Sequence, residues 1–134
     1  IVYRYSRSIM FREVGFQNFL VKLDTTLGRY QKGFDAVVVE RYGSQRHLYV
    51  AAFTGMTPRE FHRSPKKVYS DGMDHFTRLG KYHFVPRRHM QQVANDVAPK
   101  PGRFLFVSSR PLSGLRAIDS VSFQKEKAYL LVRP

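Results

Sequence analysis

The sequence predicts a single α+β domain, with one mostly antiparallel sheet, two helices and a long basic excursion from the sheet. Short runs of β-branched and aromatic residues alternate with turn residues, which is typical of strands. Two other segments carry apolar residues at helical spacing. The chain has 134 residues, 43% of them hydrophobic, which is enough for one domain with a core. We assign residues 13–134 to this domain and residues 1–12 to a basic N-terminal arm.

The first predicted helix lies within residues 13–33. Its apolar residues recur at intervals of one, three and four positions: Phe16, Phe19, Leu20, Leu23 and Leu27. Gly28 follows the last of them and is a typical helix stop. We therefore expect a helix over Glu13–Leu27. A strand over Phe19–Leu23 is the alternative, because this stretch also alternates loosely.

The most clearly patterned stretch is Phe34–Phe53, which we expect to organise the rest of the chain. Two apolar runs, Ala36–Val39 and Val50–Phe53, flank the turn-like segment Tyr42–Gln45. This pattern predicts a central β-hairpin whose strands are covered on both faces. The stretch carries no net charge, since its acids offset its bases: Asp35 and Glu40 against Arg41 and Arg46.

Residues 54–80 form the predicted excursion. Thr57 at the N-cap, Pro58 at the first helical position and Glu60 three residues after the cap match a capping box. Pro65 should end this short helix after one or two turns. The remainder reads as a long basic loop, and loops of this length in compact domains are usually functional.

A second helix follows a short strand. Tyr82–Val85 has the composition of a strand, and Pro86 is well placed as the first residue of a helix. Met90, Val93 and Val97 recur at intervals of three and four, which predicts an apolar stripe on a helix ending near Val97.

The C-terminal part returns to strand signals. Three runs are rich in β-branched, aromatic or alternating residues: Phe104–Ser108, Ile118–Gln124 and Ala128–Val132. We expect the last of these strands to pair beside the central hairpin. The whole order of elements indicates the α+β class.

The charge of the chain predicts a polyanionic partner. The net charge is +13, from 23 Lys and Arg against 10 Asp and Glu, and 15 of the basic residues are Arg. A planar guanidinium makes bidentate contacts with phosphate and stacks on aromatic rings. Nucleic acid and anionic lipid head groups are the two partners that this composition favours.

The sequence offers little for catalysis. It has no Cys, and its five His do not form a zinc-binding pair at helical spacing. No nucleophile frame or phosphate-binding glycine motif is present, and the acids are scattered among bases. No apolar run reaches the roughly 18–20 residues of a membrane-spanning helix. We therefore predict a non-enzymatic protein without a metal, cofactor or small-molecule substrate.

Basic clusters interleaved with aromatics are the candidate contact sites. The densest lie in Phe61–Tyr69 and Arg78–His89. Arg87 and Arg88 fall in the first turn of the second helix, where the dipole disfavours cations by a few tenths of a kcal/mol and a bound phosphate would relieve the conflict. Ten residues are predicted to contact nucleic acid: Arg63, Lys66, Lys67, Arg78, Lys81, Arg87, Arg88, Arg103, Arg110 and Arg116.

The leading functional hypothesis is an RNA-contacting structural subunit of a ribosome, surrounded by ribosomal RNA and neighbouring proteins. Residues 1–12 are rich in Arg and Ser and lack acids, as mitochondrial transit peptides do, which favours mitochondria over a cytoplasmic ribonucleoprotein. One alternative is an accessory subunit of a mitochondrial respiratory or ATP synthase complex that contacts anionic lipid. Another is a free single-stranded RNA- or DNA-binding protein.

Overall fold

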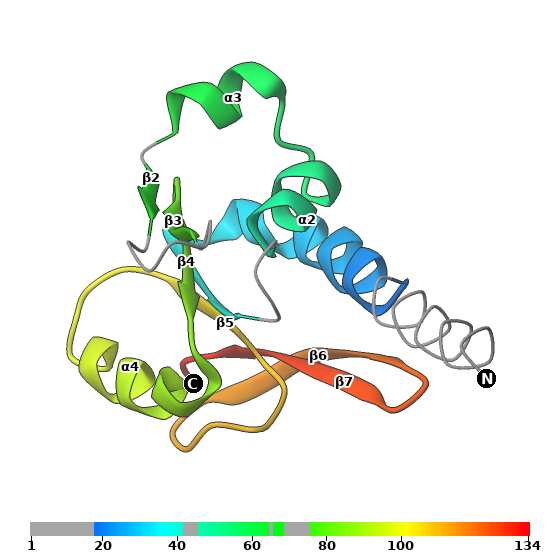
Figure 1. Cartoon of the computed structure of the whole chain (residues 1–134). Coiled ribbons are helices and arrows are strands. Elements are labelled where there is room, and N and C mark those ends of the chain that lie inside the picture. The colour runs from blue at the N-terminus through cyan, green and yellow to red at the C-terminus, as the bar shows by residue number, and fades with distance from the viewer. Residues whose placement is uncertain (1–17, 42–45, 65, 69–75) are drawn as a thin grey trace, which may run out of the picture.

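A computed structural model describes residues 18–41, 46–64, 66–68 and 76–134 (Figure 1). The basic arm predicted for residues 1–12 and the turn predicted at Tyr42–Gln45 lie outside these residues. The described strands are β1 (Ala36–Glu40), β2 (Lys66–Val68), β3 (Phe76–Leu79), β4 (Tyr82–Val85), β5 (Phe104–Ser108), β6 (Arg116–Phe123) and β7 (Glu126–Val132). The helical elements are residues 18–30, η1 (Gln31–Gly33), α2 (Arg46–Phe53), α3 (Pro58–Arg63), η2 (Arg87–His89) and α4 (Met90–Val97).

The predicted α+β class with a mostly antiparallel sheet is confirmed. The described strands form one seven-stranded sheet in the order β2-β3-β4-β1-β5-β7-β6. Its outer pairings are antiparallel, but its centre is parallel: β1 lies between β4 and β5 and runs in the same direction as both. Parallel neighbours need long crossover connections, and the helices that follow β1 and β4 supply them.

The central hairpin predicted for Phe34–Phe53 is wrong. The first arm is the strand β1, but the second apolar run belongs to the helix α2. Val50 is fully buried whereas Phe53 is 39% exposed, so the run has one buried side instead of two. The periodicity of a four-residue apolar run is compatible with both a strand and a buried helix. Here the tertiary packing of one side of the run stabilises the helix. The last strand, β7, pairs with β5 and β6 and not with β1, which corrects that expectation too.

The sheet is covered on both faces, as predicted for its central strand. Val37 and Val39 of β1 belong to one buried cluster, and Val38 belongs to the other. The first face packs against the helix 18–30 and α2 through Phe19, Leu20, Leu23, Leu27 and Val50. The opposite face packs against α4 through Met90 and Ala94, with Val93 and Val97 beside them. This confirms the apolar stripe predicted for the second helix and gives three layers.

The first helix passes through Gly28 to Tyr30, so neither the predicted stop at Gly28 nor the alternative strand over Phe19–Leu23 is correct. The glycine has a different role. A Cβ atom at Gly28 would lie 3.2 Å from the Cα of Thr54 and 3.3 Å from the carbonyl oxygen of Phe53. Gly28 therefore permits the close approach of the first helix to the end of α2.

The capping box of α3 is confirmed. The Thr57 hydroxyl accepts from the Glu60 amide at 3.1 Å, and the Glu60 carboxylate accepts from the Thr57 amide at 3.0 Å. The expectation of a long loop after α3 is wrong, because β2 and β3 pair with each other and extend the sheet at its edge. Pro86 precedes the short turn η2, and the α-helix itself starts at Met90.

Candidate nucleic-acid interface

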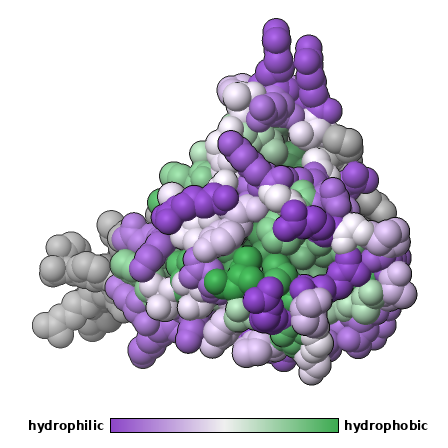
Figure 2. Space-filling model, turned by 180° about the vertical axis from the view of Figure 1, so that it is seen from behind, coloured by the Kyte–Doolittle hydropathy of each residue, from purple (hydrophilic) through white to green (hydrophobic). Residues whose placement is uncertain are grey.

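Carboxylates of the described residues are used to hold the fold together. Those of Asp35, Glu40, Glu60, Asp96 and Asp119 all accept hydrogen bonds from neutral amide or hydroxyl groups. Most arginines are exposed, and one face of the molecule shows an apolar patch bordered by hydrophilic side chains (Figure 2). Seven of the described arginines line two hollows at the surface.

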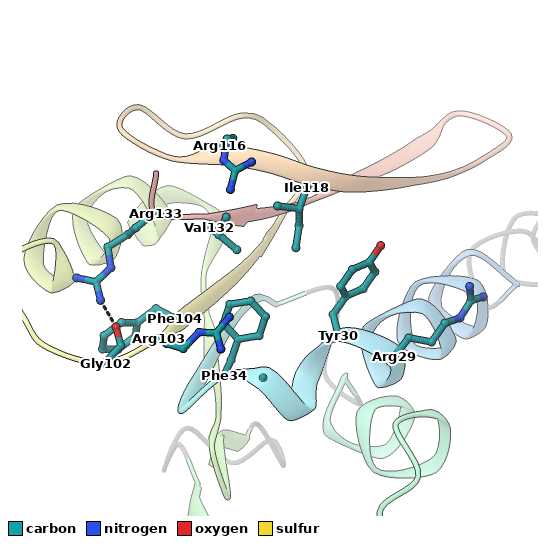
Figure 3. A pocket seen from close by; sticks show the side chains of 11 residues that line it. Arg29, Tyr30, Phe34, Gly102, Arg103, Phe104, Arg116, Ile118, Val132 and Arg133 are labelled. Carbon is teal, nitrogen blue, oxygen red and sulfur yellow. Dashed lines mark hydrogen bonds between the residues drawn. The ribbon is translucent and has the colours of Figure 1, made fainter.

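The larger hollow has a volume of about 630 Å³ and lies between η1, the start of β5 and the β6–β7 hairpin (Figure 3). We call it the arginine–aromatic groove. It is lined by four arginines and three aromatic rings from segments far apart in the sequence: Arg29, Arg103, Arg116 and Arg133, with Tyr30, Phe34 and Phe104. Arg116 extends from β6 toward the hollow (Figure 3).

Arg103 is held over an aromatic ring of this groove. Its guanidinium carbon lies 5.3 Å from the centroid of the Phe34 ring, which is a cation–π contact. Its backbone amide donates to the Asp35 carboxylate at 2.8 Å. The positive φ of Gly102, 111°, lets the chain turn beside that carboxylate. The Arg103 side chain is thus oriented at the groove while remaining exposed.

Arg133 has a structural role in the same groove. Its guanidinium donates to the carbonyl oxygens of Ala98 at 3.1 Å and Lys100 at 2.7 Å, and also to that of Gly102 (Figure 3). The same guanidinium lies 5.0 Å from the centroid of the Phe104 ring. Arg133 therefore ties the end of β7 to the segment between α4 and β5, which leaves Arg29, Arg103 and Arg116 for an anionic ligand.

The Tyr30 ring is oriented at the groove by a hydrogen bond to β6. Its hydroxyl donates to the Asp119 carboxylate at 2.8 Å. This bond, followed by burial and the negative charge of Asp119, raises the pKa of the Tyr30 hydroxyl above its ordinary value of 10.0. The ring thus stays neutral and is held in place at the groove.

The second hollow has a volume of about 540 Å³ and is lined by Pro86, Arg87, Arg88 and Arg110. We call it the strand-end hollow. All three arginines are exposed. Arg110 donates from Nη2 to the backbone oxygen of Arg87 at 3.4 Å, which joins the two segments. The prediction that Arg87 and Arg88 lie in the first turn of the second helix is wrong, because both belong to η2 and α4 begins only at Met90. Arg110, from the segment after β5, lines the same hollow.

The other predicted contact residues that the structure describes with their side chains, Arg63, Arg78 and Lys81, do not line either hollow. Arg63 is exposed at the end of α3, and Arg78 is exposed on β3 opposite Lys67 of β2. Lys66 begins β2. Lys81 makes its contacts inside the fold: its ammonium donates to the carbonyl oxygens of Gln31 and Phe34. Burial lowers the pKa of Lys81 from its ordinary value.

The sequence did not point to Arg29, Tyr30, Phe34, Phe104 or Arg133 as parts of one site. They belong to three separate segments, and each looks ordinary beside its sequence neighbours. Only the two arginines of the groove that flank strand signals, Arg103 and Arg116, were among the predicted contacts. No local pattern could have grouped the others, because the groove forms when β5, β6 and β7 pair.

The described residues contain no helix of the length and apolarity needed to cross a membrane, and no group of three or more metal-ligating His, Cys, Asp or Glu. Comparisons of the chain with protein-family models, with curated proteins and with solved structures find no match.

Proposed function

We propose that this protein is a non-enzymatic, RNA-contacting structural subunit, and that the arginine–aromatic groove is its main RNA contact. The gathering of Arg103 and Arg116 with the rings of Tyr30 and Phe34 around one hollow, with Arg29 at its margin (Figure 3), is the observation that carries this proposal. Guanidinium groups bind phosphate oxygens through charge-assisted hydrogen bonds. Aromatic faces accept nucleobases with little sequence preference. Both kinds of contact are within one hollow.

The balance between acids and bases supports the same proposal. A general acid or base would need a carboxylate or imidazole facing the groove. The carboxylates nearest to it, Asp35 and Asp119, accept hydrogen bonds from the Arg103 amide and the Tyr30 hydroxyl instead. Among the described residues, those that line the groove include guanidinium groups that can bind a polyanion and no carboxylate or imidazole.

We extend the proposal to the assembly in which the protein works. A ribosome, and a mitochondrial one in particular, is the assembly that the charge, the arginine bias and the composition of residues 1–12 favour. An accessory role in a mitochondrial membrane complex is the competing proposal. It shares the same chemistry, because lipid head groups also present phosphate to arginine.

The test measures the binding of a short fluorescent single-stranded RNA at several salt concentrations. We expect the double variant Arg103→Gln/Arg116→Gln to bind more weakly and to reduce the slope of log affinity against log salt by about two, roughly one per lost contact. The matched control is Arg59→Gln/Lys125→Gln, which removes the same charge from exposed positions outside both hollows. Anionic vesicles provide a second binding partner for every variant.

An equal loss of RNA affinity in the two double variants would mean that RNA binds through the overall positive charge of the protein and not through the groove. Binding to vesicles that depends on Arg103 and Arg116, combined with no RNA binding, would favour the membrane complex. Thermal melts of all variants accompany the titrations, and we expect them to agree closely, since exposed charges contribute little to stability.

A further inference from the structure

The parallel centre of the sheet brings three chain segments to one edge. β1 ends at Glu40, β4 at Val85 and β5 at Ser108, and these strands run in the same direction. Their carboxyl ends therefore lie at the same edge of the sheet. In open sheets with parallel strands, ligands bind outside this edge, at the point where neighbouring strands lead to opposite faces.

Such a switch point lies between β1 and β4. The chain after β1 leads to α2, whose Val50 packs on the same face as the helix 18–30. The chain after β4 leads to α4, which packs on the opposite face through Met90. The two strands are joined at this point by a hydrogen bond of 2.8 Å from the Arg41 amide to the Val85 oxygen. The strand-end hollow lies immediately after Val85.

Three arginines surround this hollow. Arg87 and Arg88 follow β4 after Pro86, and Arg110 follows β5 after Ser109. The hydrogen bond from Arg110 to the Arg87 oxygen, at 3.4 Å, holds the two segments together. Like charges brought together repel each other. The three positive charges at the switch point therefore repel one another, and a bound anion would relieve this repulsion. Unfavourable local arrangements of this kind are common at functional sites.

The position of Arg110 is fixed by a buried carboxylate. Glu40, 2% exposed, accepts from the Ser109 hydroxyl at 3.0 Å and from the Ser109 amide at 3.4 Å. The buried Ser108 hydroxyl accepts from the Arg110 amide at 3.3 Å. The turn that presents Arg110 is therefore held from inside the sheet. Residues that bind a ligand well are positioned in this way before the ligand arrives.

We propose that the strand-end hollow is a binding site for a phosphate monoester. A phosphodiester carries one negative charge, whereas a monoester carries close to two at neutral pH. Arg87, Arg88 and Arg110 together match the monoester better. The group is either the terminal phosphate of an RNA strand or the phosphate of a free nucleotide. Only the RNA form rests on the function proposed above.

The experiment compares RNAs of one sequence that carry a 5′-phosphate, a 3′-phosphate or hydroxyls at both ends. We expect one terminal phosphate to raise the affinity about tenfold, as charge-assisted contacts allow. The variant Arg87→Gln/Arg110→Gln should bring this ratio to about one. The groove variant Arg103→Gln/Arg116→Gln serves as the control, because it should weaken all three RNAs and leave the ratio unchanged.

Free nucleotide and inorganic ligands separate the two sources of the phosphate. Titration of pyrophosphate, adenosine 5′-monophosphate and adenosine is followed by NMR at the backbone amides of residues 87–89 and 108–110. Shifts with both phosphates and none with adenosine support the site even if no RNA binds, in which case the proposed RNA function fails alone. Arg88→Gln, at an exposed position, replaces the double variant if that one does not fold.

Two results would overturn the inference. One is an affinity ratio near one for the wild-type protein together with no shift by adenosine 5′-monophosphate. The other is a terminal-phosphate effect that survives both Arg87→Gln/Arg110→Gln and Arg88→Gln. RNA binding through the groove would remain standing in either case.

Discussion

Gly28 has a different role in the fold from the one that its local sequence indicates. By position it reads as a helix stop, yet the helix continues to Tyr30. We expect Gly28→Ala to destabilise the protein by about 1–3 kcal/mol, although Ala is the better helix former, because the new methyl group meets the backbone of Thr54 at 3.2 Å. Thermal or urea denaturation measures the difference.

Gly33→Ala is the matched control. A Cβ at Gly33 would meet only the guanidinium nitrogens of Arg103, at the ordinary van der Waals distance of 3.9 Å. The free energy of unfolding of this variant should lie within about 0.5 kcal/mol of the wild-type value, as it does for most surface substitutions. If Gly28→Ala proves as stable as Gly33→Ala, the close approach of the first helix to α2 is not a constraint.

His83 makes stability depend on pH. Burial, and then the positive charge of Arg78 opposite it on β3, lower the pKa of His83 below its ordinary value of 6.5. The unfolded chain therefore binds the proton more tightly than the folded one. Stability should fall as pH drops from about 6.5 through the lower folded pKa and be regained above 6.5.

The measurement is the melting temperature between pH 8 and pH 5. We expect His83→Gln to lose less stability on acidification than wild type. His62→Gln, at an exposed position on α3, corrects for a general effect of removing a histidine. If acidification lowers the melting temperature of the two variants equally, His83 is not responsible for the pH dependence of stability.

At the scale of elements, β1 is the centre of the molecule even though its predicted hairpin partner is a helix. Val38 of β1 is 3% exposed and packs with Phe106 and Met90 on the α4 face. Val38→Asp places a charge there without a partner and should destabilise the fold by about 4 kcal/mol or more. Circular dichroism and thermal melting detect the loss.

Ser122→Asp on β6 is the comparison, since it adds the same charge at an exposed strand position. We expect it to leave the melting temperature almost unchanged. Val38→Asp melting like Ser122→Asp would show that β1 is not the organising strand.

At the scale of the whole molecule, charge distribution governs the interaction with RNA. The groove offers three arginines and the strand-end hollow another three. A protein making six phosphate contacts should lose roughly a thousandfold in affinity between about 50 and 200 mM salt, through counterion release. Fluorescence anisotropy titrations at several salt concentrations measure this slope. A slope near zero would rule out polyanion binding at these arginines.

What the sequence determined by itself came from interactions between near neighbours. The capping box at Thr57 and Glu60, the apolar stripe of α4 and the β-branched run of β1 each depend on spacings of a few residues. Composition likewise determined the positive charge and the choice of arginine, because these do not depend on how the chain folds. The class of fold and the nature of the expected partner follow from these features.

Tertiary structure alone decided which neighbours β1 has, and with them both candidate sites. Val50–Phe53 became helical because one side of it packs on the sheet, which four apolar residues cannot specify in sequence. Arg103 and Arg116 meet Phe34 only after β5 and the β6–β7 hairpin join the sheet. Arg110 reaches Arg87 only because β1 is flanked by two parallel strands. Strand pairing over long sequence separations depends on the total burial that it achieves, so no local pattern records it.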